Sequence, residues 1–102
     1  MPDVQVSNNA EAARYEARVG AKIVGFAEYQ LTDDLIAFTH TEVEPAYEGQ
    51  DVGSALARAA LDEVRGTNRK VLPLCPFIKG WIGHHREYVD LVYGAPPGPA
   101  PY

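Results

Sequence analysis

The residues best suited to chemistry gather around a polar turn at 47–56, Tyr-Glu-Gly-Gln-Asp-Val-Gly-Ser-Ala-Leu. A strand-like run precedes this turn, and a helical pattern rich in small residues follows it. A glycine-bearing turn that opens a helix leaves backbone N–H groups without internal partners, and the helix dipole adds partial positive charge there. Such a turn favours an anion, typically a phosphate. The plainer alternative is a helix start with Asp51 as its N-cap and no ligand.

Two further side chains are candidates for acid, base or nucleophile. Cys75 is the only cysteine and precedes Pro76. Because proline is favoured at the first helical position, Cys75 is predicted to cap a helix, where the dipole favours thiolate. The alternative for Cys75 is a small buried hydrophobe. His40 is the best general-base candidate. Glu42, which is in phase with His40 along the strand, is a weaker candidate. The alternative for His40 is a histidine that only makes hydrogen bonds within the sheet.

The elements that must position these residues begin with a meander of strands. Residues 14–19 alternate apolar and charged side chains, the period of a half-solvated antiparallel strand. Two more β-prone runs follow at 22–31 and 35–43, separated by turn residues. A short edge strand is predicted at 4–6, with a turn at Asn8-Asn9.

From Val52 to Arg65 apolar residues recur at spacings of three and four, which predicts a helix that ends at Gly66. A short apolar strand follows at 69–74. A strand, helix, strand order implies a right-handed crossover and hence a parallel pair. A second helix is predicted from Cys75-Pro76, and residues 87–92 read as one further turn or a short strand. The fold class is therefore α/β (α+β), a mixed, mostly antiparallel sheet covered by two helices.

Composition limits the classes of partner. The 102 residues suit one domain, predicted at 1–93, with a flexible Gly/Pro-rich tail at 94–102. A net charge of -5 argues against a nucleic-acid or anionic-membrane partner, since both need a basic face. No apolar run approaches 18 residues, so no membrane span is expected. One cysteine excludes an internal disulfide and a cysteine-based zinc site, and a reducing cytoplasmic compartment is expected.

The spacing Gln50-x-x-Gly53-x-Ala55 fits the Q/R-x-x-G-x-G/A pattern of the Gcn5-related N-acetyltransferases, and it lies after a meander and at a helix start. The segments at 40–43, 72–77 and 86–88 add to the likeness. From about residue 6 to residue 92 the chain resembles the small single-domain N-acetyltransferase-like subfamily of that superfamily.

This resemblance implies transfer of an acetyl group from acetyl-CoA to an amine, with no metal. Backbone N–H groups would meet the pyrophosphate of coenzyme A, and the pantetheine arm would pair with backbone near the end of the 35–43 strand, which splays from the 69–74 strand. Cys75 would lie close to the thioester, as a nucleophile that forms an acetyl-cysteine or as an acid that protonates the departing thiolate. The implied cofactor-binding residues are Glu42, Val43, Gln50, Asp51, Val52, Gly53, Ser54, Ala55 and, as a lining of the slot, Phe77.

One position departs from the family pattern. Asp51 stands where the family often has a second glycine, and its carboxylate would lie near the pyrophosphate and compete for the same N–H groups. This predicts weaker coenzyme A binding than in a glycine-bearing relative.

Two other functions stay open from the sequence. The first is a non-catalytic module that binds coenzyme A or an acyl-CoA. The second is a thiol hydrolase or redox sensor that uses Cys75 with His40. The acceptor amine, a small molecule or a protein lysine, and the oligomeric state are not indicated. His84 and His85 are adjacent and on a helix cannot point the same way, so a metal pair is not expected; His85 is predicted to pack beside Trp81.

Overall fold

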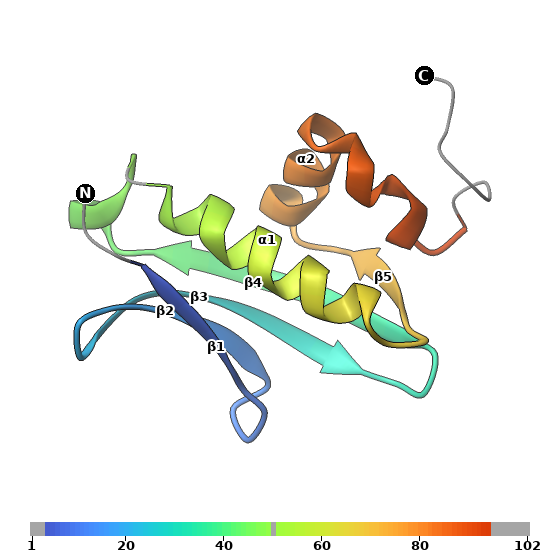
Figure 1. The fold of residues 1–102 in the computed structure, drawn as a ribbon, viewed down its shortest axis with the longest axis horizontal. Coiled ribbons are helices and arrows are strands. Elements are labelled where there is room, and N and C mark those ends of the chain that lie inside the picture. The colour runs from blue at the N-terminus through green and yellow to red at the C-terminus, as the bar shows by residue number, and fades with distance from the viewer. Residues whose placement is uncertain (1–3, 50, 95–102) are drawn as a thin grey trace.

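The computed structural model describes residues 4–49 and 51–94, which form a five-stranded sheet with helices packed against it (Figure 1). The strands follow the order β1-β2-β3-β4-β5 across the sheet. Strands β1 to β4 are antiparallel neighbours, whereas β5 lies parallel to β4. The predicted fold class is confirmed. The elements are β1 (Gln5–Asn9), β2 (Arg14–Val19), β3 (Lys22–Leu31), β4 (Leu35–Val43), η1 (Pro45–Tyr47), α1 (Val52–Arg65), β5 (Lys70–Pro73), α2 (Pro76–His84) and η2 (Arg86–Leu91).

The predicted turn at Asn8-Asn9 is wrong, because both residues pair with β2 inside strand β1. Their side-chain amides have partners that make a strand position acceptable. Tyr29 Oη donates to Asn8 Oδ1 over 2.6 Å, and Asn9 Nδ2 donates to Glu16 over 3.1 Å. Asn9 keeps part of its turn character, because its Oδ1 accepts from Ala12 N–H over 3.3 Å in the turn that follows the strand. The Asn8 amide instead bonds to Tyr29 and Glu63, which are remote in the sequence.

Helix α1 lies across the sheet and buries the apolar stripe that its sequence predicts. Leu56 and Leu61 are fully buried against the sheet core, where Phe38 is also inaccessible to solvent. Each such side chain contributes roughly 1.5–3 kcal/mol through its burial. The helix ends at Arg65, and Gly66 follows as its C-cap, which agrees with the predicted stop; Gly66 N–H donates back to Glu63 O over 3.1 Å.

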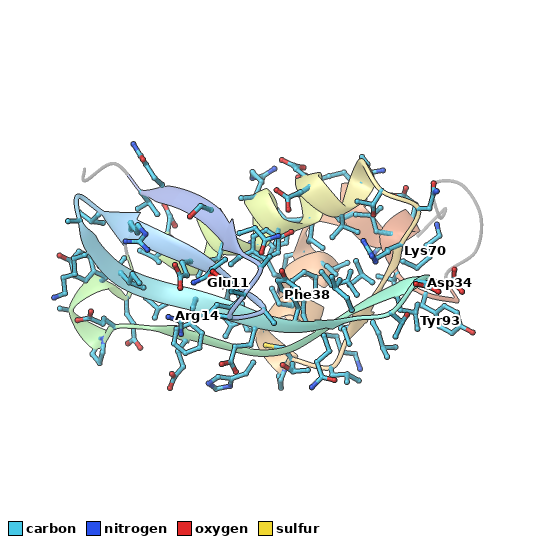
Figure 2. The ribbon with its side chains drawn as sticks, turned by 90° about the horizontal axis from the view of Figure 1, so that it is seen from below. Glu11, Arg14, Asp34, Phe38, Lys70 and Tyr93 are labelled. Carbon is cyan, nitrogen blue, oxygen red and sulfur yellow. The ribbon has the colours of Figure 1, made fainter. Side chains whose placement is uncertain are left out.

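Directly opposed residues on neighbouring strands share a face, so the pairing register assigns side chains to the two faces of the sheet. Tyr15, Ala27 and Thr41 are opposed across β2, β3 and β4. Tyr15 Oη donates to Glu63 of α1 over 2.7 Å, which places this row on the helix-covered face. The next row, Arg14, Glu28 and His40, therefore lies on the open face. In Figure 2 Phe38 lies in the layer between sheet and helices, and Arg14 lies on the other side of the sheet.

Strands β4 and β5 pair only over their first four residues, from Leu35↔Lys70 to Phe38↔Pro73. The pairing closes with a bond from Cys75 N–H to Phe38 O over 2.8 Å. Strand β4 then continues to Val43, while the chain after β5 turns into α2. The two strands thus separate beyond Phe38, which creates a gap between β4 and α2.

The stretch after α2 combines the two structures that its sequence allowed. Residues 86–91 form the short 3-10 helix η2, and Val92 then makes an isolated parallel bridge to Val71 of β5. Tyr93 N–H donates to Val71 O over 2.8 Å. The predicted tail lies outside the described residues from position 95 onward. Among the described residues, neither α1 nor α2 has the length and apolar character that crossing a membrane requires.

Candidate functional site

A cavity of about 430 Å³ opens where β4 separates from α2. Four elements supply its lining: Thr41 and Val43 from β4, the turn at 47–49 and 51, the first turn of α1, and Phe77 with Trp81 from α2. The glycine-bearing turn and the end of β4 thus border one cavity. The sequence presented them as two distinct features.

The start of α1 offers backbone donors to this cavity. The first backbone bond of the helix runs from Ala55 N–H to Asp51 O over 2.9 Å. The N–H groups of Val52, Gly53 and Ser54 precede it, so they have no partner within the helix. These three residues line the cavity, whereas Ala55 does not appear in its lining.

Asp51 is the N-cap of α1, yet its side chain makes no capping hydrogen bond. Its backbone is left-handed, with φ 62°, a conformation that glycine adopts freely and that aspartate tolerates better than most residues. Its carboxylate therefore does not cap the helix, and Asp51 lines the cavity. Gln50, the first residue of the predicted motif, lies outside the described residues.

The free edge of β4 offers a second row of backbone groups. Glu44 N–H donates to Val24 O of β3 over 2.8 Å. Strand backbone groups alternate between the two neighbouring strands, so Glu42 faces β3, while Thr41 and Val43 face the cavity. Of the two residues predicted to meet a pantetheine arm, Val43 therefore presents its backbone to the cavity and Glu42 does not.

Helix α2 is joined to the first turn of α1 by two contacts that shape the cavity. Trp81 Nε1 donates to Ser54 Oγ over 2.8 Å. A Cβ added at Gly53 would lie 2.8 Å from Phe77 Cζ, so any other residue there would require that ring to shift. Phe77, which the family resemblance implies as a lining of the slot, is exposed and lines the cavity. Trp81 is buried and also lines the cavity, although the sequence pointed to it only as a partner of His85. Its indole N–H and its spacing of four residues from Phe77 were the signals that could have found it.

Cys75 caps α2 but lies behind the cavity wall. Its side chain makes no capping bond, and the residue is buried. Cys75 Sγ donates to Thr41 Oγ1 over 3.4 Å. Thr41 lines the cavity, and Cys75 does not. The sequence did not single out Thr41, because its place beside the thiol follows only from the bond that joins Cys75 to β4.

His40 does not meet Cys75. Its ring lies on the open face of the sheet, with Nε2 3.7 Å from Glu42 Oε1 and its centroid 6.1 Å from that of Phe26. The side chain is 53% exposed. A second cavity of about 420 Å³ lies beside this row and is bordered by Phe26, Glu42 and Arg14.

No set of three or more His, Cys, Asp or Glu residues in the described part of the chain could hold a metal ion. His85 stacks on Trp81 with ring centroids 3.7 Å apart, which confirms the predicted packing. His85 Nδ1 lies 2.8 Å from Trp81 O, so this histidine packs onto the end of α2 as its C-cap residue.

Known protein families and structures agree with this architecture. Residues 14–91 match the family model of the GCN5-related N-acetyl-transferases. A GCN5-like candidate N-acetyltransferase from Staphylococcus aureus has a similar solution structure, with a TM-score of 0.69, 22% identity and coverage of 94% of each chain. The ribosomal-protein-alanine N-acetyltransferase from Brucella melitensis biovar Abortus 2308 gives a TM-score of 0.54 at 18% identity, over 87% of this chain and 67% of that one.

At these identities the two structures support the fold alone. A comparison with curated protein sequences finds no significant match. The match to the family model does not depend on the two solved structures. It spans most of the sheet, both helices and the cavity between β4 and α2. The chain belongs to the GCN5-related N-acetyltransferase family.

Proposed function

We propose that this protein transfers an acetyl group from acetyl-CoA to an amine, and that coenzyme A occupies the cavity between β4, α1 and α2. The observation that carries the proposal is the meeting, in one 430 Å³ space, of a helix start and a strand edge. The first N–H groups of the helix have no partner within it, and no other described strand pairs with that edge of β4 beyond Phe38. An extended ligand with a phosphate at one end and amides along its length matches both features. Family membership supports the same co-substrate.

The phosphate end would lie at the turn. The N–H groups of Val52, Gly53 and Ser54 point from the start of α1, where the helix dipole favours an anion. Gln50, Asp51 and Ala55 complete the motif to which the family resemblance assigns the pyrophosphate. Because the net charge is -5, attraction here depends on these local donors and not on the overall field.

The pantetheine amides would pair along the free edge of β4, as a further strand pairs with a sheet edge. Val43 and Thr41 turn their backbone groups that way, and the ring of Phe77 would form the opposite wall. This direction leads from the helix start toward Phe38 and Cys75, so the thioester would lie near the point where β4 and β5 separate.

Catalysis would depend on orientation of the thioester and on proton handling. Cys75 is proposed for the thioester end. His40 is proposed to accept a proton from the amine, with Glu42 3.7 Å away as its partner. Since His40 lies on the open face, the amine would approach from that side while coenzyme A enters from the helix side. The acceptor would be a small amine or a protein lysine.

The proposal is tested by calorimetric titration with acetyl-CoA and by release of free coenzyme A with and without an added amine. We expect saturable binding and amine-dependent release. Failure of acetyl-CoA to bind would remove the proposal.

A coenzyme A-binding module without turnover is the second candidate. The burial of Cys75 and the separation of His40 from it favour this alternative. Tight binding of acetyl-CoA with no release above the rate without protein, across small amines and a lysine-rich peptide, would identify it.

A further inference from the structure

Two side chains, Thr41 and Cys75, meet at the end of the cavity where β5 stops pairing with β4. Cys75 Sγ donates to Thr41 Oγ1 over 3.4 Å, and Cys75 N–H donates to Phe38 O over 2.8 Å. One side-chain link and one backbone link therefore fix the thiol relative to β4.

Access to the cavity differs between the two side chains. Thr41 lines the cavity, whereas Cys75 is only 3% exposed and lies behind it. Nucleophilic attack on a thioester needs the sulfur within roughly 3–3.5 Å of the carbonyl carbon. Thr41 borders the space in which that carbon would lie, and Cys75 does not.

The direction of the hydrogen bond gives the hydroxyl a free proton. A threonine hydroxyl has one proton to donate and two lone pairs to accept. Because Thr41 Oγ1 accepts from the Cys75 thiol, its own proton remains available for an acceptor in the cavity. The two groups form a chain, S–H to O–H, that leads from the buried sulfur to the cavity.

We propose that Thr41 and Cys75 relay a proton to the leaving thiolate of coenzyme A, so that Thr41 touches the substrate and Cys75 supplies the proton from behind it. This inference rests on the proposed function. The amine nitrogen bonds to the thioester carbonyl carbon, the C–S bond breaks, and its electron pair goes to the sulfur of coenzyme A. That sulfur takes the proton of Thr41, and Thr41 takes the proton of Cys75. The nitrogen releases one proton to His40, and one proton from solvent then restores the Cys75 thiol through Thr41, so no net proton is consumed.

The hydrogen bond itself is tested by infrared spectroscopy, without turnover. Cys75 is the only cysteine, so the S–H stretching band belongs to it alone. Thr41→Val keeps the size of the side chain and removes the hydroxyl, whereas Thr41→Ser keeps the hydroxyl. We expect the band to move to higher frequency in Thr41→Val and to keep its wild-type position in Thr41→Ser. The same band in wild type and Thr41→Val would overturn the relay.

The role of the Cys75–Thr41 hydrogen bond in the reaction is tested by measuring acetyl transfer in a single turnover. Thr41→Val and Cys75→Ala should each lower the rate by about 100-fold, the usual contribution of a positioned acid, with the Kd of acetyl-CoA within about twofold of wild type. The double variant should lose no more than either single variant, because the two groups act as one unit. Thr41→Ser should recover most of the rate. Losses that multiply in the double variant would contradict the relay.

Mass spectrometry of the wild type, quenched during turnover, distinguishes the relay from covalent catalysis. We expect no acetyl group on Cys75, and an acetyl-cysteine that forms at the rate of turnover would overturn the relay. Absence of acetyl-CoA binding to the wild type would remove the proposed function and the relay with it. An unshifted S–H band in a protein that still transfers acetyl groups would remove the relay alone.

Discussion

Trp81 Nε1 donates to Ser54 Oγ over 2.8 Å, and this bond joins α2 to the first turn of α1. Ser54 belongs to the helix start whose N–H groups open into the cavity, and Trp81 lines the same cavity. The hydroxyl of Ser54 is thus committed to shaping the site, while its backbone N–H remains available to a ligand.

Ser54→Ala should destabilise the protein by about 1–3 kcal/mol, because it leaves the buried indole N–H without an acceptor. Trp81 is the only tryptophan, so its fluorescence reports on this site directly. We expect a lower urea midpoint and an altered emission spectrum, with Ser54→Thr close to wild type because it keeps a hydroxyl. An alanine variant as stable as wild type would contradict this role of the bond.

Gly53→Ala should weaken acetyl-CoA binding by several-fold, because the new Cβ would lie 2.8 Å from Phe77 Cζ and the ring, which lines the cavity, would have to shift. The loss of stability should be smaller, since alanine is the better helix former by about 1 kcal/mol. Calorimetric titration measures the affinity. Adding Phe77→Leu to Gly53→Ala should restore it, and a double variant as weak as the single one would mean that the ring is not the cause.

Asp51→Gly should bind acetyl-CoA several-fold more tightly and be more stable by about 1 kcal/mol. Glycine adopts the φ of 62° without strain, and the side chain that it replaces makes no capping bond. Asp51→Asn separates the two causes, because it removes the charge and keeps the tolerance of a left-handed backbone. We expect it to share the gain in affinity. Equal or weaker binding by the glycine variant would refute the predicted penalty at Asp51.

Glu16 should make stability depend on pH in the acid range. Its side chain is almost fully buried on the open face, and hydrogen bonds from Asn9, Arg14 and Arg18 hold the pKa of its carboxyl below the ordinary value. The unfolded chain therefore binds this proton more readily than the folded chain. The stabilisation is complete above the unfolded pKa and is lost as the pH falls through the folded one.

Urea unfolding of Glu16→Gln and of the wild type between pH 7 and about pH 3 checks this prediction. The variant should be less stable at pH 7, because its amide accepts more weakly from two arginines, and the difference should shrink below about pH 4.3, where the unfolded carboxyl is protonated. Glu11→Gln, at an exposed position, is the matched control and should show no such convergence. A constant difference across the whole range would exclude the Glu16 carboxylate as its source.

The sequence determined most of the elements of this fold. Strands β2, β3 and β4 have the predicted bounds, because 14–19 alternates, 22–31 and 35–43 are rich in β-prone residues, and turn residues such as Gly20 separate the runs. Helix α1 begins at Val52 and ends at Arg65, as its apolar spacing predicts. The failure at Asn8-Asn9 has the opposite cause, since the partners that hold those amides in a strand come from β2 and β3. Local pattern is reliable where local interactions decide the structure.

Only the tertiary structure decided which candidate residues share a site. His40 and Thr41 are neighbours in the chain, yet strand alternation sends one to the open face and the other to the thiol of Cys75. The cavity exists because β5 stops pairing at Pro73 and α2 turns against α1, and no single segment encodes that separation. A residue's type sets the chemistry that it can do. The side of the sheet on which it lies, and the chain that packs there, depend on contacts between segments that are remote in the sequence.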